Sequence, residues 1–544
     1  MKYLLKNGYI VDGSGADGYI GNVLIQDDRI QKIFTTEVLV PDAIVIDCTN
    51  KVIAPGFIDA HSHQDWYVCG TNEREATECF IRQGVTTYVT GNCGDGIAGF
   101  PKDSPYINDI AGHLPGAQLT DKELTWRTYP EYFDFLEKRG LRQNMAVLCG
   151  HAMTAFSVLG GLPKERITPK RELDTIKGLL ADAMDAGCKG MSFGLAYRPA
   201  SFLTDKEMRE IAQLAIDRNK VITVHGRVYK AYAPYLYGDD MKTPHNVRWL
   251  RDFLQLFRDS GAKMQYSHLI FSGRKAWESY DCMFEMFDEM IQNGGMDLGF
   301  DYYPYSQGTV DITPMMPASF FTYLKDHVDP WNNTEFIQCF EREVAKLYEK
   351  YGIEANDLGI CAPGCKELEA YKGMRLGDMS QQRNVSFGQN LLDIYRLSRG
   401  SASLYSYVDQ PEENIPKQMA HEKVLYMTDA SISPGSPANP GLYGGMVRFI
   451  RIAREYQNMK LEEVITRMTG RSAIRFSLKD RGFLRAGYYA DITVFDPIKV
   501  TDKATFEKPE QFAEGIEQVF INGNLILDQK KFYSDIFAGK ILKD

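Results

Sequence analysis

Eight short apolar runs, most of them separated by amphipathic segments, occupy the middle of this 544-residue chain. Helical periodicity lies between most of the runs, for example over residues 176–186, 205–218 and 280–293. A regular alternation of strand and helix favours parallel strands joined by crossover helices. Eight such units predict an α/β fold with a closed (β/α)8 TIM barrel rather than an open sheet. The expected strands are residues 57–63, 86–92, 145–151, 190–195, 221–227, 263–269, 298–303 and 424–429.

The two ends of the chain differ from the middle and resemble each other. Both consist of short strand-like runs broken by Asn-Gly and Asp-Pro turns, which are typical of hairpins. Because neither end has enough apolar surface to fold alone, we expect residues 1–54 and 485–544 to combine into one small β-sandwich domain. The barrel then takes residues 55–484. Within it, residues 305–420 are too long for a single crossover, and we expect them to form an inserted lid over the barrel mouth.

Composition excludes several classes of partner. The net charge is −10, and no basic tract is present, which argues against nucleic acid or an anionic membrane as a partner. No apolar run approaches the ~20 residues of a membrane span, and the first residues lack a secretory signal. The ten cysteines show no repeated zinc-finger spacing. These features predict a reduced, cytoplasmic protein that acts on a small molecule, and they leave its oligomeric state open.

Potential metal ligands stand at the ends of several predicted strands. Functional groups of such barrels lie at the C-terminal ends of the strands. Each residue alone also has a structural interpretation, as a buried histidine, a buried thiol or a helix-capping aspartate. Six of them at one rim favour a site instead. They are His61 and His63 after the first strand, Cys93 after the second, His225 after the fifth, His268 after the sixth and Asp429 after the eighth.

The residue types point to a reaction class. Imidazole and thiolate ligands select Zn²⁺ or a similar ion over magnesium or calcium. Bound Zn²⁺ brings the pKa of water to around neutrality and polarises a carbonyl group. Asp429 suits a general base that takes the proton of water and passes it to a leaving nitrogen. The sequence therefore predicts metal-assisted hydrolysis, most plausibly of an amide.

Seven segments of the chain resemble the amidohydrolase superfamily and, within it, the D-aminoacylase / N-acyl-D-amino-acid deacylase family. The resemblance covers both ends and most of the predicted barrel but not residues 305–420. A cysteine ligand after strand two is specific to this family. The matching segments are 54–63 (APGFIDAHSH), 83–87 (QGVTT), 91–94 (GNCG), 194–200 (GLAYRPA), 267–269 (SHL), 301–305 (DYYPY) and 486–497 (AGYYADITVFDP).

This resemblance implies roles for individual residues. It implies an enzyme acting on C–N bonds other than peptide bonds, with a tight zinc site formed by Cys93, His225 and His268. A second, weaker site would use His61 and His63, with Asp429 nearby as the catalytic base. Tyr197 would contact the scissile carbonyl. Many relatives bridge two metals with a Lys after strand four, and its absence here agrees with Cys93 in that role.

Two departures from the family put the substrate in question. The family commonly has a Lys two residues after the strand-six His, where this chain has Ile270. It also has an Arg that holds the substrate carboxylate, where this chain has Asn-Pro-Gly at 439–441. We therefore expect altered specificity, with Tyr197, Ile270, Arg227 and Arg274 among the substrate-binding residues. Candidate replacements for the missing cations are Arg198, Arg227, Arg274 and Arg448.

Two other functions compete with a deacylase. A cyclic-amide hydrolase of the hydantoinase or dihydroorotase kind would need no carboxylate-binding Arg, because its substrate is a ring. A catalytically inactive relative serving as a scaffold would have lost ligands. Here every proposed ligand and Asp429 are present, which argues against the scaffold.

Overall fold

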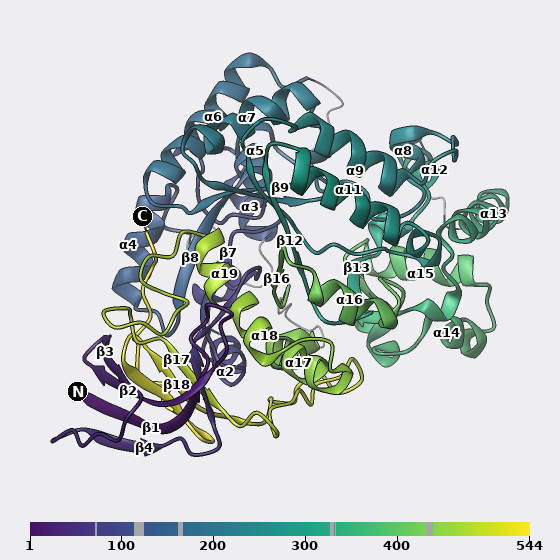
Figure 1. Ribbon diagram of the computed structural model, residues 1–544. Coiled ribbons are helices and arrows are strands. Elements are labelled where there is room, and N and C mark those ends of the chain that lie inside the picture. Colours follow the sequence, from purple (N-terminus) through teal and green to yellow (C-terminus); the bar gives the residue numbers. More distant parts are fainter. Residues whose placement is uncertain are drawn as a thin grey trace.

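The predicted (β/α)8 barrel is confirmed. The structure is a computed structural model, and it describes residues 1–70, 73–113, 124–161, 167–326, 331, 333–430 and 439–543. Eight parallel strands form one sheet in chain order, and Ala60, the residue after the first strand, donates its N–H to Tyr426 O of the last strand at 3.2 Å. Figure 1 labels β7, β8, β9, β12 and β16 of this sheet. The strands are β6 (Phe57–Asp59), β7 (Val85–Thr90), β8 (Asn144–Gly150), β9 (Gly190–Gly194), β10 (Val221–His225), β11 (Lys263–Tyr266), β12 (Asp297–Tyr302) and β16 (Val424–Tyr426).

Amphipathic helices follow the strands. In α7, Met208, Ile211, Ala212 and Ala215 form the buried face at helical spacing, and Thr204 opens the helix with a capping box to Glu207. The longer helices are α2 (Glu73–Ile81), α4 (Tyr129–Arg139), α5 (His151–Leu159), α6 (Lys170–Asp185), α7 (Asp205–Asp217), α9 (His245–Leu256), α11 (Tyr280–Asn293) and α17 (Pro440–Tyr456). The shorter ones are α1 (Asp65–Val68), α3 (Ile107–His113), α8 (Pro234–Tyr237), α10 (Arg274–Trp277), α18 (Leu461–Arg467) and α19 (Gly470–Arg475).

Both chain ends build a second sheet. Figure 1 shows the purple N-terminal strands beside the yellow C-terminal ones, and β17 pairs antiparallel with β5. The strands share a core to which both ends contribute, including Leu5, Ile25, Ile492 and Phe520. This confirms a β-rich domain made from the two ends, while its boundaries near 54 and 485 stay predictions. The strands are β1 (Lys2–Ile10), β2 (Tyr19–Gln26), β3 (Arg29–Phe34), β4 (Ile44–Asp47), β5 (Val52–Pro55), β17 (Ile492–Phe495), β18 (Ile516–Ile521), β19 (Asn524–Asp528) and β20 (Lys531–Phe532).

One apolar run contains two strands. Residues 52–59 look continuous in sequence, but β5 belongs to the β-rich sheet and β6 to the barrel. The change occurs at Gly56, whose N–H donates to Asp491 O, while Phe57 N donates to Gly84 O. A Cβ at Gly56 would lie 2.2 Å from Thr86 Oγ1, so only glycine fits this crossing. The barrel strand also ends at Asp59, and His61 and His63 lie in the turn beyond it.

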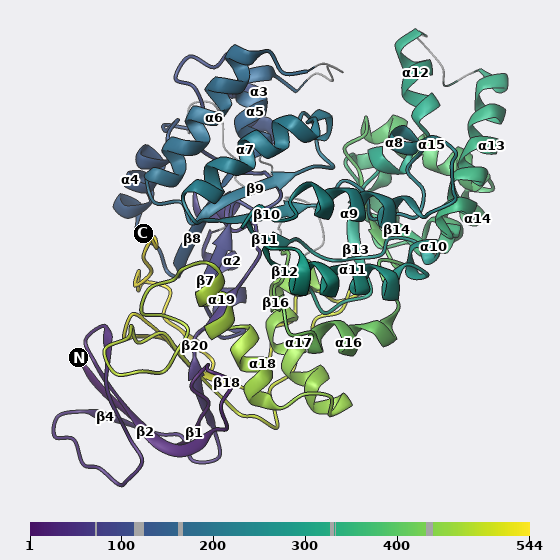
Figure 2. The same ribbon diagram turned by 45° about the horizontal axis from the view of Figure 1, so that its top comes forward.

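The long span between β12 and β16 forms a compact insert with its own apolar core. Phe320, Phe336, Phe340 and Val344 pack together there. Figure 2 shows its helices α12 to α15 grouped away from the β-rich sheet. Its role as a lid stays a prediction. Its elements are β13 (Gly308–Asp311), β14 (Leu358–Ala362), β15 (Ser403–Ser406), α12 (Ala318–Asp326), α13 (Thr334–Tyr351), α14 (Leu376–Arg383), α15 (Phe387–Ser398) and α16 (Ile415–Ala420).

Among the described residues, no helix is both long enough and apolar enough to cross a membrane.

Candidate metal and catalytic site

The site lies where β6, β7, β10, β11 and β16 end. All six residues predicted as ligands or base lie in this region, and the five His and Cys residues are buried. Asp429 is partly exposed, with 26% of its side chain accessible. The barrel thus brings together residues that are far apart in the sequence, as the strand-end argument predicts.

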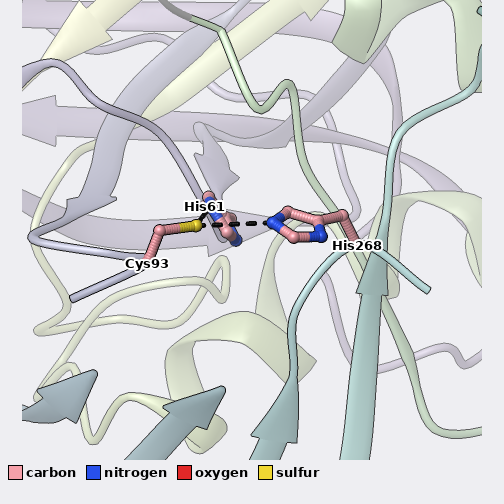
Figure 3. A group of neighbouring side chains, drawn as sticks. All are labelled: His61, Cys93 and His268. Atoms are coloured by element: carbon pink, nitrogen blue, oxygen red, sulfur yellow. Dashed lines mark hydrogen bonds between the residues drawn. The ribbon is translucent and has the colours of Figure 1, made fainter. Parts of the chain in front are cut away.

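A first group of ligands centres on Cys93. Its Sγ lies 3.4 Å from His61 Nε2 and 3.4 Å from His268 Nε2, between the two rings (Figure 3). Ligands of a tetrahedral Zn²⁺, bound at about 2.0–2.3 Å, lie roughly 3.3–3.8 Å from one another. The spacing and the soft or borderline donors of this group therefore fit such an ion.

A second group centres on Asp429. Its Oδ1 lies 3.3 Å from His61 Nε2 and 3.5 Å from His63 Nε2. Burial opposes ionisation of Asp429, but the neighbouring His268, His61 and His63 outweigh this effect and lower the carboxyl pKa. His61 is common to both groups, so the two candidate metal positions adjoin.

His225 joins the site through His268. Its Nδ1 lies 2.9 Å from His268 Nε2, and Tyr197 OH lies 3.4 Å from the same Nδ1. Burial and the mutual influence of the histidines lower the pKa of His225, and burial lowers the pKa of His268. Both imidazoles are therefore neutral at pH 7, which is the form that binds metal. The geometry groups Cys93 and His268 with His61, whereas His225 contacts His268 from outside this group, so the predicted tight-site set stays a prediction.

Two buried carboxylates support the ligands, and sequence reasoning assigned no role to either. Asp301 Oδ1 accepts a hydrogen bond from His268 N at 2.7 Å and lies 3.4 Å from His61 Nδ1. Asp59 accepts bonds from Thr428 Oγ1 at 2.6 Å, Thr428 N at 3.0 Å and His61 N at 3.3 Å. Asp301 holds the backbone of His268 and lies behind the ring of His61, as carboxylates behind metal-binding histidines do. Asp59 ties the ends of strands one and eight together. Both lie inside segments that resemble the family, 54–63 and 301–305, and this was the only feature of the sequence that could have pointed to them.

Three site residues have a left-handed backbone. The φ angles are 54° at Cys93, 33° at His268 and 48° at Asp429. Non-glycine residues rarely adopt this conformation, which costs roughly 1–3 kcal/mol at each position and persists only where the surroundings enforce it. Here the barrel strands and the buried hydrogen bonds enforce it.

The predicted substrate-binding residues lie in different surroundings. Tyr197 is 42% exposed at the barrel mouth, and Ile270 is half-buried against the apolar cluster that contains Tyr303 and Met427. Arg227 is half-buried and donates to Leu203 O at 3.0 Å. Arg274 is held by Asp357, with one contact of 2.8 Å.

Of the other positions considered for carboxylate binding, Arg448 and Asn439 already make contacts elsewhere. Arg448 is paired with Asp502 at 3.0 Å. Asn439 caps α17 by accepting a hydrogen bond from Gly441 N at 2.8 Å. Arg198 is exposed, with its guanidinium 5.7 Å from the centre of the Phe202 ring.

The chain belongs to the amidohydrolase family, whose model matches residues 44–242 and 419–527. Two curated proteins of Alcaligenes xylosoxydans xylosoxydans are similar over nearly their whole length. D-aminoacylase is 27% identical over 99% of this chain and 97% of its own. N-acyl-D-glutamate deacylase is 27% identical over 97% and 94%. The resemblance drawn from the seven segments is thereby confirmed, and the chain is a hydrolase of C–N bonds other than peptide bonds.

Solved structures confirm the fold. A crystal structure of D-aminoacylase matches with a TM-score of 0.78 at 24% identity, over 100% of this chain and 99% of that one. An N-acyl-D-glutamate deacylase from Bordetella bronchiseptica, complexed with zinc and a phosphonate inhibitor, matches with a TM-score of 0.79 at 23% identity and the same coverage. A dihydropyrimidinase from Brevibacillus agri NCHU1002 is more distant, with a TM-score of 0.55 at 13% identity, over 100% of this chain and 98% of that one.

Proposed function

We propose that this protein is a zinc-dependent deacylase of N-acyl-D-amino acids with a preference for neutral side chains. The observation that carries the proposal is the buried pair of ligand groups around Cys93 and Asp429, which share His61. The similarity to D-aminoacylase over almost the whole chain supports the substrate class. The apolar side chain of Ile270 supports the preference.

Zinc is the ion that best suits a thiolate with imidazoles. We infer one tightly held ion and a second, weaker position, with Cys93, His225 and His268 in the first and His61 and His63 in the second. When bound, zinc polarises the amide carbonyl and brings the pKa of water to around neutrality. His61 adjoins both positions, because its Nε2 faces Cys93 and Asp429 alike.

Asp429 acts as the general base in this proposal. Its lowered pKa keeps the carboxylate ionised at neutral pH, ready to accept the proton of the attacking water. The same carboxyl group then passes the proton to the leaving nitrogen. Tyr197, whose hydroxyl lies 3.4 Å from His225 Nδ1, donates a hydrogen bond to the scissile carbonyl.

The test measures metal content and turnover on the same preparation. We expect about one tightly bound zinc per chain and hydrolysis of N-acetyl-D-methionine, lost on chelation and restored by Zn²⁺. N-acetyl-L-methionine, hydantoin and dihydroorotate are the comparison substrates. Full activity without metal would falsify the mechanism, and faster turnover of the cyclic amides would favour the cyclic-amide hydrolase instead.

The preference for neutral side chains has its own test. A buried carboxylate without a paired cation carries a heavy desolvation penalty, and Ile270 supplies no charge. We expect a higher kcat/KM for N-acetyl-D-methionine than for N-acetyl-D-glutamate, and a shift toward the glutamate substrate in Ile270→Lys. Ile498→Lys adds the same charge at a side chain that is 81% exposed and serves as the control. Strong preference of the unmodified enzyme for acidic substrates would contradict this part of the proposal.

A further inference from the structure

Lys230 carries an ammonium group with weak partners. The residue is half-buried, and its Nζ lies 3.3 Å from Met315 Sδ and 4.7 Å from the centre of the Tyr351 ring. Over the described part of the chain it forms no ion pair with a carboxylate. Burial lowers the Lys230 pKa to about 8, with Asp409 acting in the opposite direction. A desolvated ammonium whose partners are a thioether and a ring face would be stabilised by an anion.

The loop that carries Lys230 is part of the site. It begins at His225, and the ring of Tyr229 packs 5.2 Å from the His225 ring and 5.5 Å from the His268 ring. Ser272 N donates to Tyr229 O at 3.2 Å. This bond holds the loop after β10 against the loop after β11, two residues beyond Ile270. Lys230 directly follows Tyr229, the residue through which this loop contacts both histidines and the loop after β11.

The pKa of Asp409 is influenced by both Lys230 and the proposed base Asp429. Its carboxyl group is buried and accepts hydrogen bonds from Ser406 Oγ at 2.7 Å and Tyr303 OH at 3.3 Å. Burial raises the Asp409 pKa to about 6, Lys230 lowers it and Asp429 raises it further. Both groups thus lie close enough to act on one carboxyl. Asp409 also lies against the loop after β11, because Phe271 N donates to Asp409 O at 2.8 Å, and its carboxyl group is occupied by its own hydrogen bonds.

The arginines near the mouth are less suitable. Arg274 and Arg448 are held by Asp357 and Asp502. The guanidinium of Arg227 donates to Leu203 O, and the charged or titratable groups acting on it are Asp205, Tyr235 and Tyr237 rather than groups of the site. The hydrogen bond that the Arg227 guanidinium makes is thus with Leu203, not with a residue of the metal site.

We propose that the ammonium of Lys230 binds the free carboxylate of the substrate. This inference rests on the proposed deacylase function and refines its substrate class. One ammonium pairs with one carboxylate, so the class is acylated amino acids with a single free carboxylate and a neutral side chain. The cation is supplied by the loop after strand five, while the strand-six position next to it is apolar.

The experiment compares a free acid with its neutral analogue. N-acetyl-D-methionine and its primary carboxamide differ only in the charge that Lys230 would bind. Lys230→Met should raise KM for the acid by about 10–100-fold, the loss typical of a charged hydrogen bond, with a smaller effect on kcat and none on the carboxamide. Lys230→Arg should recover part of the loss. Lys350→Met, which removes a cation paired with Asp239, is the matched control.

Two results would overturn the inference. One is an unchanged ratio of acid to carboxamide turnover in a Lys230→Met protein that retains the unmodified melting temperature. The other is loss of acid preference in Arg227→Met but not in Lys230→Met, which would assign the carboxylate to Arg227. Absence of turnover of every N-acyl-D-amino acid by the unmodified enzyme would instead refute the proposed function itself.

Discussion

The barrel rim and the insert are built in opposite ways. The rim joins residues from distant segments, and Asp59 and Thr428, 369 positions apart, are hydrogen-bonded there. The insert is one continuous stretch with an apolar core of its own. The family model covers the rim segments His61, Cys93, His225 and Asp429 but skips residues 243–418. The chemistry we propose thus rests on the strand ends, whereas the insert lies outside the residues that the family model matches.

The largest expected effect removes a rim ligand. His268→Ala takes away the nitrogen between Cys93 and His225, and we expect metal content and activity to fall together, with activity reduced by about 10⁴-fold or more. Elemental analysis and a deacylase assay measure this. His421→Ala, outside the site and paired with Asp288, is the control. If a metal-depleted His268→Ala protein retained activity, the strand-end residues would not carry out the reaction.

Asp429→Asn separates the base from the metal. The amide cannot accept a proton as a carboxylate does, so kcat should fall by about 10²–10⁴-fold while the metal stays bound. Asn also tolerates the left-handed backbone at this position, so the fold should not change. The measurement is kcat at constant metal occupancy. Near-normal turnover would rule out Asp429 as the base.

Asp301→Asn tests the support behind the ligands. The substitution keeps the shape but removes the charge next to His61 Nδ1, and such changes typically weaken metal affinity or activity about 10–100-fold. Competition with a chelator gives the affinity. Asp297→Asn changes the exposed Asp at the other end of the same strand and should leave the affinity unaltered. Equal effects of the two variants would contradict the role of Asp301.

A core substitution in the insert should affect stability more than chemistry. Phe340 is 2% exposed and packs on Phe320, so Phe340→Ala should lower the free energy of unfolding by about 3–5 kcal/mol. Metal content should stay full, and kcat should change less than KM. Phe287→Ala makes the same deletion in the barrel helix α11. Loss of metal from Phe340→Ala would show that the two regions are not independent.

The smallest effect is a pH dependence specific to the acid substrate. Lys230 is charged below its pKa of about 8 and loses its proton as the pH rises through that value. Between pH 7 and 9, KM for the free acid should therefore rise several-fold relative to KM for the carboxamide. This change is within the free energy that a hydrogen bond to a charged group contributes. The titratable groups facing Lys230 are Asp409 and Tyr351. A constant ratio across this range would count against the charge of Lys230 in binding.

The sequence was informative where local pattern decides structure. All eight barrel strands were predicted, because each is an apolar run bounded by turns, and the polar residues after them mark the rim. The first barrel strand was expected over residues 57–63 but ends at Asp59, because periodicity does not show where the chain leaves a sheet. Asp301 and Lys230 were missed for a related reason. Their importance comes from contacts with His61 and with the insert, and such distant pairings leave no local signal.

The left-handed φ angles of Cys93, His268 and Asp429 place backbone strain in the reactive centre. Glycine at any of these positions would relax the backbone and remove the functional group in the same substitution. In the metal-free protein such a variant would gain stability, whereas in the metal-loaded protein the lost metal binding would offset that gain. Selection for heat resistance therefore preserves these residues only if zinc is present or turnover is required at the same time.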